Sequence, residues 1–277
     1  MSDKMNINPA ILSWIQTRCA KSDADCHRYF GEKKFKGWKS GVVQPTYAEL
    51  QRIGEFFRKP IAVFFFSEIP IYQDTRKTFK TLPDSASIFR EDFIALIDWA
   101  RIMQLNLYEL HEGINPSSNL ITRSSFDLSH TNKLASQLRS TLGLSLEEQK
   151  QFASPELAFK RFQEAFYHAG VFVFKGIFKN NNIAGVSLTD EVFPVICIND
   201  SLSYTRQIFT LIHELCHLLH GTSGVDFLSL PKDLSLKENK IEAKCAALAC
   251  AFLAPELKFL VDTLEIPIDC ENIKTIS

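Results

Sequence analysis

The sequence feature that most constrains this chain is the run His213-Glu214-Leu215-Cys216-His217. Residues four apart on an α-helix lie on one face about one turn apart, so the two imidazoles can bind one metal ion. Zinc accepts imidazole nitrogens at about 2.0–2.1 Å, and the intervening glutamate can reach a water on such an ion. With 7 histidines in 277 residues, chance produces this pattern in roughly one chain in a hundred. The pattern therefore predicts a zinc (Zn2+) site formed by His213 and His217, with Glu214 beside it.

A catalytic zinc needs a third protein ligand and one position left for water. Glu242 is the leading candidate, because it opens a helix whose following turns are almost wholly apolar. Glu238 lies four residues earlier on the same face and stays an alternative; Asp226 and Asp233 are weaker ones. The helix dipole alone also favours acids in a first turn. Cys216 is predicted to pack in the core rather than to bind the metal.

Charge is distributed unevenly along the chain. The 31 lysines and arginines balance 32 acids to a net charge of −1, which excludes a global attraction to nucleic acid or anionic membranes. Between Gln16 and Pro60, however, the chain has ten basic and five acidic residues, a local net charge of +5. The net charge of the rest of the chain is therefore near −6. This local excess indicates either DNA phosphate contacts or a solvated basic face. The residues predicted to contact DNA are Arg28, Lys33, Lys34, Lys36 and Lys39.

Cysteine usage and the apolar segments indicate the compartment. The 7 cysteines include no Cys-x-x-Cys pair, which favours a reducing environment. The start of the chain shows no apolar core of a secretory signal. The longest apolar stretch, Cys245 to Pro255, is far shorter than the roughly 20 residues needed to span a bilayer. We therefore expect a cytoplasmic protein without membrane association.

Hydrophobic periodicity predicts an α+β chain in three parts. Residues 1–70 form a small helical domain, 71–130 a linker and a long helix over Ile88–Glu112, and 131–277 a domain with a short β-sheet. The helices expected in that last part are His130–Leu142, Pro155–Ala169, Ser203–His220 and Leu236–Leu253; the strands are 171–174, 183–188 and 194–198. The strand before the motif helix either offers its edge to an extended substrate or is ordinary sheet.

Three segments around the motif resemble the ImmA/IrrE family of zinc-dependent metallopeptidases. They are Pro194–Asn199, Arg206–His220 and Ile241–Pro255. The resemblance implies a zincin-like peptidase domain with Glu214 as the catalytic base and Glu242 as the third zinc ligand. The first part of the chain resembles a helix-turn-helix module of the XRE type. That similarity is carried by Ile7–Trp14, Trp38–Gly41, Gln44–Thr46 and Pro60–Phe66.

The resemblance implies a regulatory zinc endopeptidase that cleaves a repressor or other regulatory protein in a mobile-element, toxin–antitoxin or stress circuit. The alternative is a DNA-binding or antitoxin-like transcriptional regulator whose zinc site is structural or inactive. The sequence departs from the family at Ala246, where asparagine is common, and its helix-turn-helix is shortened, with Gly37 in the recognition helix. The part after Pro255 is expected to be short for the family.

Overall fold

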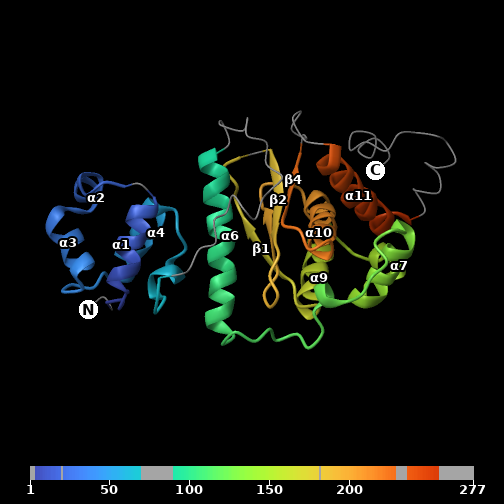
Figure 1. Ribbon diagram of the computed structural model, residues 1–277, viewed down its shortest axis with the longest axis horizontal. Helices are drawn as coiled ribbons and strands as arrows, with labels where there is room; N and C mark the ends of the chain where they lie inside the picture. The colour runs from blue at the N-terminus through green and yellow to red at the C-terminus, as the bar shows by residue number, and fades with distance from the viewer. Residues whose placement is uncertain (1–3, 20, 70–89, 181, 229–235, 256–277) are drawn as a thin grey trace. The chain divides into compact units, whose positions relative to one another are not determined.

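The computed structural model describes residues 4–19, 21–69, 90–180, 182–228 and 236–255, and its contacts divide the chain into two compact units (Figure 1). The first unit contains the described residues up to Ile69 together with Phe93–Ile114, and the second contains Arg90–Asp92 and the described residues from Asn115 onward. No helix within these described ranges is long and apolar enough to cross a membrane.

The first unit is helical, and it includes most of the long helix that was predicted to lie in the 71–130 segment. Its helices are α1 (Pro9–Arg18), α2 (Asp23–Phe30), α3 (Glu32–Ser40), α4 (Tyr47–Phe57), the 3-10 helix η1 (Ile61–Phe65) and α6 (Arg90–Leu110). Ser22 and Thr46 begin α2 and α4 with reciprocal capping boxes. Gly31 alone separates α2 from α3, at φ 87°, whereas the turn of a helix-turn-helix usually has three or four residues. The resemblance to that motif therefore stays a prediction.

A buried ion cluster ties α6 to the rest of this unit. Asp98 accepts hydrogen bonds from Nε and Nη2 of Arg18, at 3.1 and 2.7 Å, and from Nζ of Lys59, at 3.1 Å. The side chains of Lys59 and Asp98 are only 4% and 6% exposed. Removing one member of such a cluster leaves a charge in the interior without its partner, which is far more costly than losing a surface ion pair.

We expect Asp98→Ala to lower the free energy of unfolding by about 3–5 kcal/mol, because it leaves the buried Lys59 ammonium without its partner carboxylate. The three tryptophans, Trp14, Trp38 and Trp99, all lie in this unit, so urea unfolding followed by tryptophan fluorescence reports on it directly. Glu32→Ala, which breaks the exposed pair of Glu32 with Lys36, is the control and should change stability much less. Equal effects of the two substitutions would contradict the role assigned to Asp98.

The second unit combines helices with a four-stranded sheet, which confirms the α+β class. Its helices are η2 (Ile121–Arg123), α7 (Thr131–Leu142), α8 (Leu146–Lys150), α9 (Pro155–His168), α10 (Tyr204–Leu219) and α11 (Leu236–Leu253), and its strands are β1 (Phe172–Gly176), β2 (Ile183–Leu188), β3 (Val195–Asn199) and β4 (Gly224–Phe227). The elements predicted here are confirmed to within two residues at each end. The three that the sequence did not reveal are η2, α8 and β4.

The strand order is β1-β3-β2-β4, with β1 parallel to β3 and the other neighbours antiparallel. The interpretation of residues 194–199 as an edge that receives a substrate is therefore wrong, because β3 is paired on both sides. The strands with an edge not paired within this sheet are β1 and β4. Of these two, β4 directly follows the motif helix in sequence.

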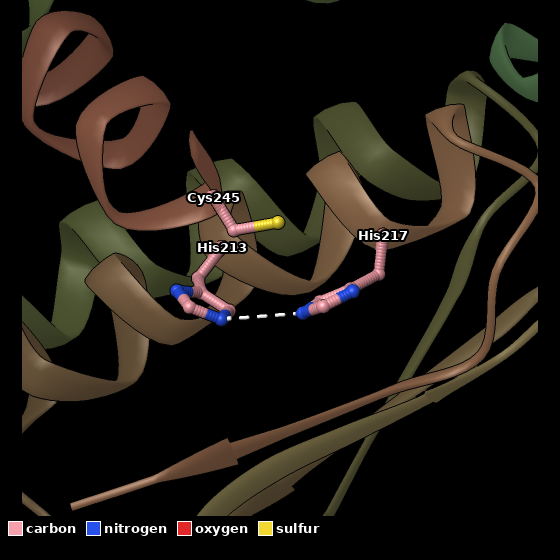
Figure 2. A group of neighbouring side chains, drawn as sticks. All are labelled: His213, His217 and Cys245. Atoms are coloured by element: carbon pink, nitrogen blue, oxygen red, sulfur yellow. Dashed lines mark hydrogen bonds between the residues drawn. The ribbon is translucent and has the colours of Figure 1, made fainter. Parts of the chain in front are cut away.

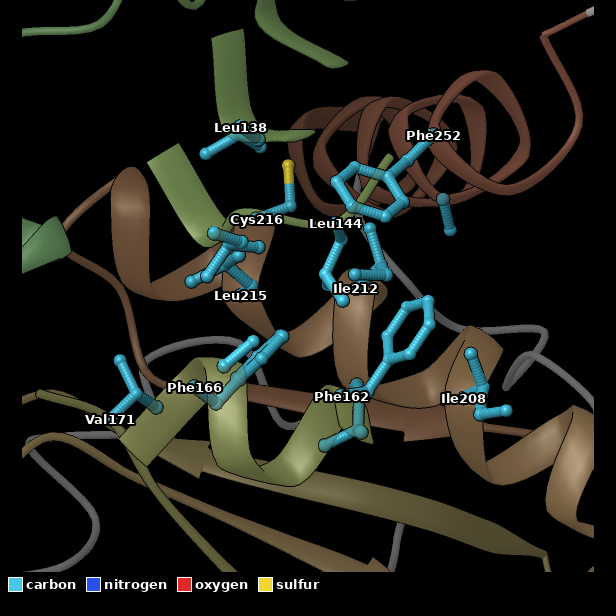
Figure 3. Packing of buried hydrophobic residues seen from close by; sticks show 14 of the residues in the cluster. Leu138, Leu144, Phe162, Phe166, Val171, Ile208, Ile212, Leu215, Cys216 and Phe252 are labelled. Carbon is cyan, nitrogen blue, oxygen red and sulfur yellow. The ribbon is translucent and has the colours of Figure 1, made fainter. Parts of the chain in front are cut away.

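The main core lies around α10, which packs on α9, α11 and strands β2 to β4. Figure 3 shows the apolar side of α10, including Ile208, Ile212 and Leu215, meeting Phe162 of α9 and Phe252 of α11. The polar side of α10 is buried as well: Thr210 and Glu214 are 0% exposed. The motif helix is thus covered on both sides, so its polar groups must find partners inside the protein.

Candidate metal centre

The predicted ligands come together between α10 and α11. Nε2 of His213 lies 3.3 Å from Nε2 of His217, and the Glu242 carboxylate has one oxygen 3.0 Å from the first nitrogen and the other 3.3 Å from the second. Figure 2 shows the two imidazoles projecting from α10 with these nitrogens facing each other. The histidines are buried, and the Glu242 side chain is 15% exposed, so the cluster meets solvent at the carboxylate.

These separations fit a metal ion. Ligand atoms at about 2.0–2.1 Å from a tetrahedral zinc lie about 3.3–3.4 Å from one another. The two imidazole nitrogens lie 3.3 Å apart, and the two oxygens of Glu242 lie 3.0 and 3.3 Å from one nitrogen each, so a small rotation of the carboxylate would present one oxygen to a shared ion. Two imidazoles and one carboxylate form a donor set of the catalytic type, which uses three protein ligands and leaves one position for water. The arrangement can therefore hold Zn2+ without a large rearrangement of the two helices.

The charges around the cluster favour a cation. Burial alone lowers the pKa of His213, but Asp226, Glu242 and Glu214 outweigh it and raise this pKa to about 9. Burial alone raises the pKa of Glu242, yet hydrogen bonds from the two imidazoles outweigh it and hold that pKa at about 2. The acids thus stabilise positive charge on the imidazoles, and a metal ion can take the place of those protons.

Cys245 is a site residue that the sequence reasoning missed. Its Sγ and ring nitrogens of His213 and His217 all lie within 4.8 Å of one another, and Figure 2 shows its thiol beside the imidazoles. A hydrogen bond with Cys216 and burial both raise the pKa of Cys245. The Glu242 carboxylate, by contrast, has one oxygen 3.0 Å from Nε2 of His213 and the other 3.3 Å from Nε2 of His217. Glu242 is therefore the better third ligand. Its spacing of three residues from Cys245 on one helix was the signal available in the sequence.

Glu214 is held by two hydrogen bonds from strands β2 and β4. Its Oε2 accepts from the Ser187 hydroxyl at 2.5 Å, and its Oε1 accepts from the backbone N–H of Asp226 at 2.8 Å. Burial raises the pKa of this carboxyl, and the nearby histidines lower it in part. The side chain is thus fixed in orientation and basic for a glutamate.

The other candidate ligands fall into two groups. The Asp226 carboxylate accepts two hydrogen bonds from Arg206, at 2.7 and 2.8 Å, and one from Thr210 at 2.8 Å, so it joins β4 to α10. Asp233 and the side chain of Glu238 lie outside the described residues. Cys216 is buried in the core as predicted, where a hydrogen bond from Cys245 lowers its pKa to about 5 despite burial.

The residues predicted to contact DNA lie on α2 and α3, away from this cluster in sequence. Ion pairs join four of them to neighbouring acids: Arg28 to Asp25, Lys34 to Glu49, Lys36 to Glu32 and Lys39 to Asp23. Lys33 also lies on α3 and is exposed. Partners of this kind reduce the charge offered to phosphates. DNA contact by these residues stays a prediction.

Comparison with known proteins bears on the second unit. Residues 167–275 match the family model Peptidase_M78, described as the IrrE N-terminal-like domain. The match includes all four strands, the motif helix α10 and α11, and it supports the resemblance to the ImmA/IrrE family. No curated protein and no solved structure matches the chain. This part of the chain is thus similar to a peptidase domain, and the helical first unit lies outside the match.

Proposed function

We propose that this protein is a zinc-dependent endopeptidase that cleaves a repressor or another regulatory protein. The observation that supports it is the convergence of His213, His217 and Glu242 at the ligand spacing of a tetrahedral zinc site. Glu214 lies between the two histidines on the same helix. The match of residues 167–275 to a peptidase family supports the same reaction class.

Each side chain has a distinct part in the proposed reaction. His213, His217 and Glu242 would hold the ion, which supplies Lewis acidity that activates a water and polarises the scissile carbonyl. Glu214 accepts the proton of the attacking water and passes it to the leaving amine. Burial raises the pKa of Glu214 and so brings its basicity closer to neutral pH, where proton transfer is most effective.

The regulatory part of the proposal follows from the resemblance to ImmA/IrrE proteins, which implies a protein substrate in a mobile-element, toxin–antitoxin or stress circuit. An extended segment of such a substrate can add to a sheet edge through main-chain hydrogen bonds. We assign this role to β4, because β3 is enclosed between β1 and β2 and β4 contacts the motif helix.

Metal removal tests this function. We expect the zinc-loaded protein to cleave members of a synthetic peptide library, detected by mass spectrometry. A zinc chelator should abolish the cleavage, and added Zn2+ should restore it, because the proposed reaction depends on the Lewis acidity of the metal. Cleavage that persists after zinc removal would refute the proposal. A stoichiometrically zinc-loaded protein that leaves every peptide intact would instead favour a structural metal.

A further inference from the structure

Strand β4 has a glycine where it passes the His217 ring. A Cβ built on Gly224 would lie 2.3 Å from Cγ and from Cδ2 of His217 and 2.8 Å from its Nδ1, whereas real Cβ atoms essentially never come closer than 3.0 Å to another heavy atom. The β4 backbone thus lies directly against the imidazole. Figure 2 shows this ring projecting from α10 toward the strands.

Backbone conformation does not explain the glycine. The glycines with positive φ in the described chain are Gly31, Gly41, Gly113, Gly143, Gly170 and Gly221, and Gly224 is not among them. Its φ is one that other residues adopt readily. Glycine is therefore required at position 224 because the His217 ring occupies the space that a side chain would need.

The same stretch of β4 also orients Glu214. The Gly224 N–H donates to Oγ of Ser187 at 3.1 Å, and the Ser187 hydroxyl donates to Glu214 at 2.5 Å. The Asp226 N–H donates to the other Glu214 oxygen at 2.8 Å. The N–H groups of Gly224 and Asp226, two residues apart on one strand, thus act on Glu214, one through Ser187 and one directly, while the strand backbone contacts His217.

We propose that Gly224 is a positioning residue for the metal centre, which sets the orientation of His217 by letting the β4 backbone lie against its ring. This inference rests on the proposed metal-dependent function. A side chain at position 224 would overlap the imidazole and displace it from its present position beside Glu242 and His213, and so weaken metal binding. Contacts that orient metal ligands typically change metal affinity by about 10–100-fold.

Gly185 on β2 provides a matched control. A Cβ there would lie 2.4 Å from Cγ2 of Thr210, so Gly185→Ala introduces a clash of similar size between the sheet and the same helix. Thr210 is not a metal ligand; its hydroxyl donates to Asp226. General damage to the packing of α10 should therefore appear in both variants, whereas displacement of His217 should appear only in Gly224→Ala.

Zinc affinity measured by competition with a fluorescent chelator tests the proposal without any substrate. We expect Gly224→Ala to weaken zinc binding by at least about 10-fold and Gly185→Ala to change it by less than about threefold. Unchanged affinity in Gly224→Ala, or equal losses in the two variants, would overturn the positioning role. If the unaltered protein binds no zinc, the proposed function itself fails.

A double-mutant cycle in the metal-free protein tests the contact separately. Gly224→Ala should lower the urea midpoint of the unaltered protein markedly but have little effect when His217→Ala has already removed the ring. If Gly224→Ala alone does not fold, the double variant with His217→Ala is expected to fold again. A loss of stability that is the same in both backgrounds would show that the glycine serves something other than the imidazole.

Discussion

Glu214→Gln is expected to keep zinc bound with unchanged affinity and to reduce peptide cleavage by about 10²–10⁴-fold, the usual contribution of a general base. Glutamine has nearly the shape of glutamate, and its amide oxygen can still accept the hydrogen bond from the Asp226 N–H. The amide cannot take a proton from water. The substitution therefore removes the base while His213, His217 and Glu242 remain in place.

Cleavage of a library peptide under single-turnover conditions, together with zinc competition, measures both effects. Glu164→Gln is the control, because it makes the same chemical change at an exposed position on α9 and should leave both values unchanged. Full cleavage by Glu214→Gln would exclude Glu214 as the base. Loss of zinc in the same variant would assign Glu214 a role in holding the metal site together instead.

Local sequence patterns predicted most of what surrounds the candidate site. The apolar stripe of Ile208, Ile212 and Leu215 defines α10, and the bounds of β2 and α11 are as predicted. Glu242 lies against both histidines, but it is the seventh residue of α11 and so lies beyond the first turn in which it was expected. Helical period is a local property, so a single sequence is enough to read it.

The features that the sequence did not reveal depend on contacts between distant segments. Strand β4 is four residues long, with the sequence Gly-Val-Asp-Phe, and it exists because it pairs with β2. The enclosed position of β3 likewise follows from strand order, which is not encoded in the pattern of one strand. The role inferred for Gly224 depends on the distance between this strand and His217. Such a distance cannot be inferred from the spacing of residues along the chain.

Removal of the third metal ligand is expected to have the largest effect on metal binding. Zinc binding to small protein sites is worth at least about 10 kcal/mol, so the loss of one of three ligands should weaken affinity by roughly 100-fold or more. We expect this loss for Glu242→Ala and a change of less than about threefold for Cys245→Ala, measured by chelator competition. The Glu242 carboxylate already contacts both imidazoles, whereas the Cys245 thiol is hydrogen-bonded with Cys216.

Replacing zinc with Co2+ distinguishes Glu242 from Cys245 as a ligand directly, through the absorption bands of the metal. A thiolate ligand produces a sulfur-to-cobalt charge-transfer band, and a carboxylate does not. The Co2+ protein should lack this band if His213, His217 and Glu242 are the protein ligands and a solvent position remains open. A band that is present in the unaltered protein and absent in Cys245→Ala would add Cys245 as a ligand. With four protein ligands the site would be closed, and a closed site is structural rather than catalytic.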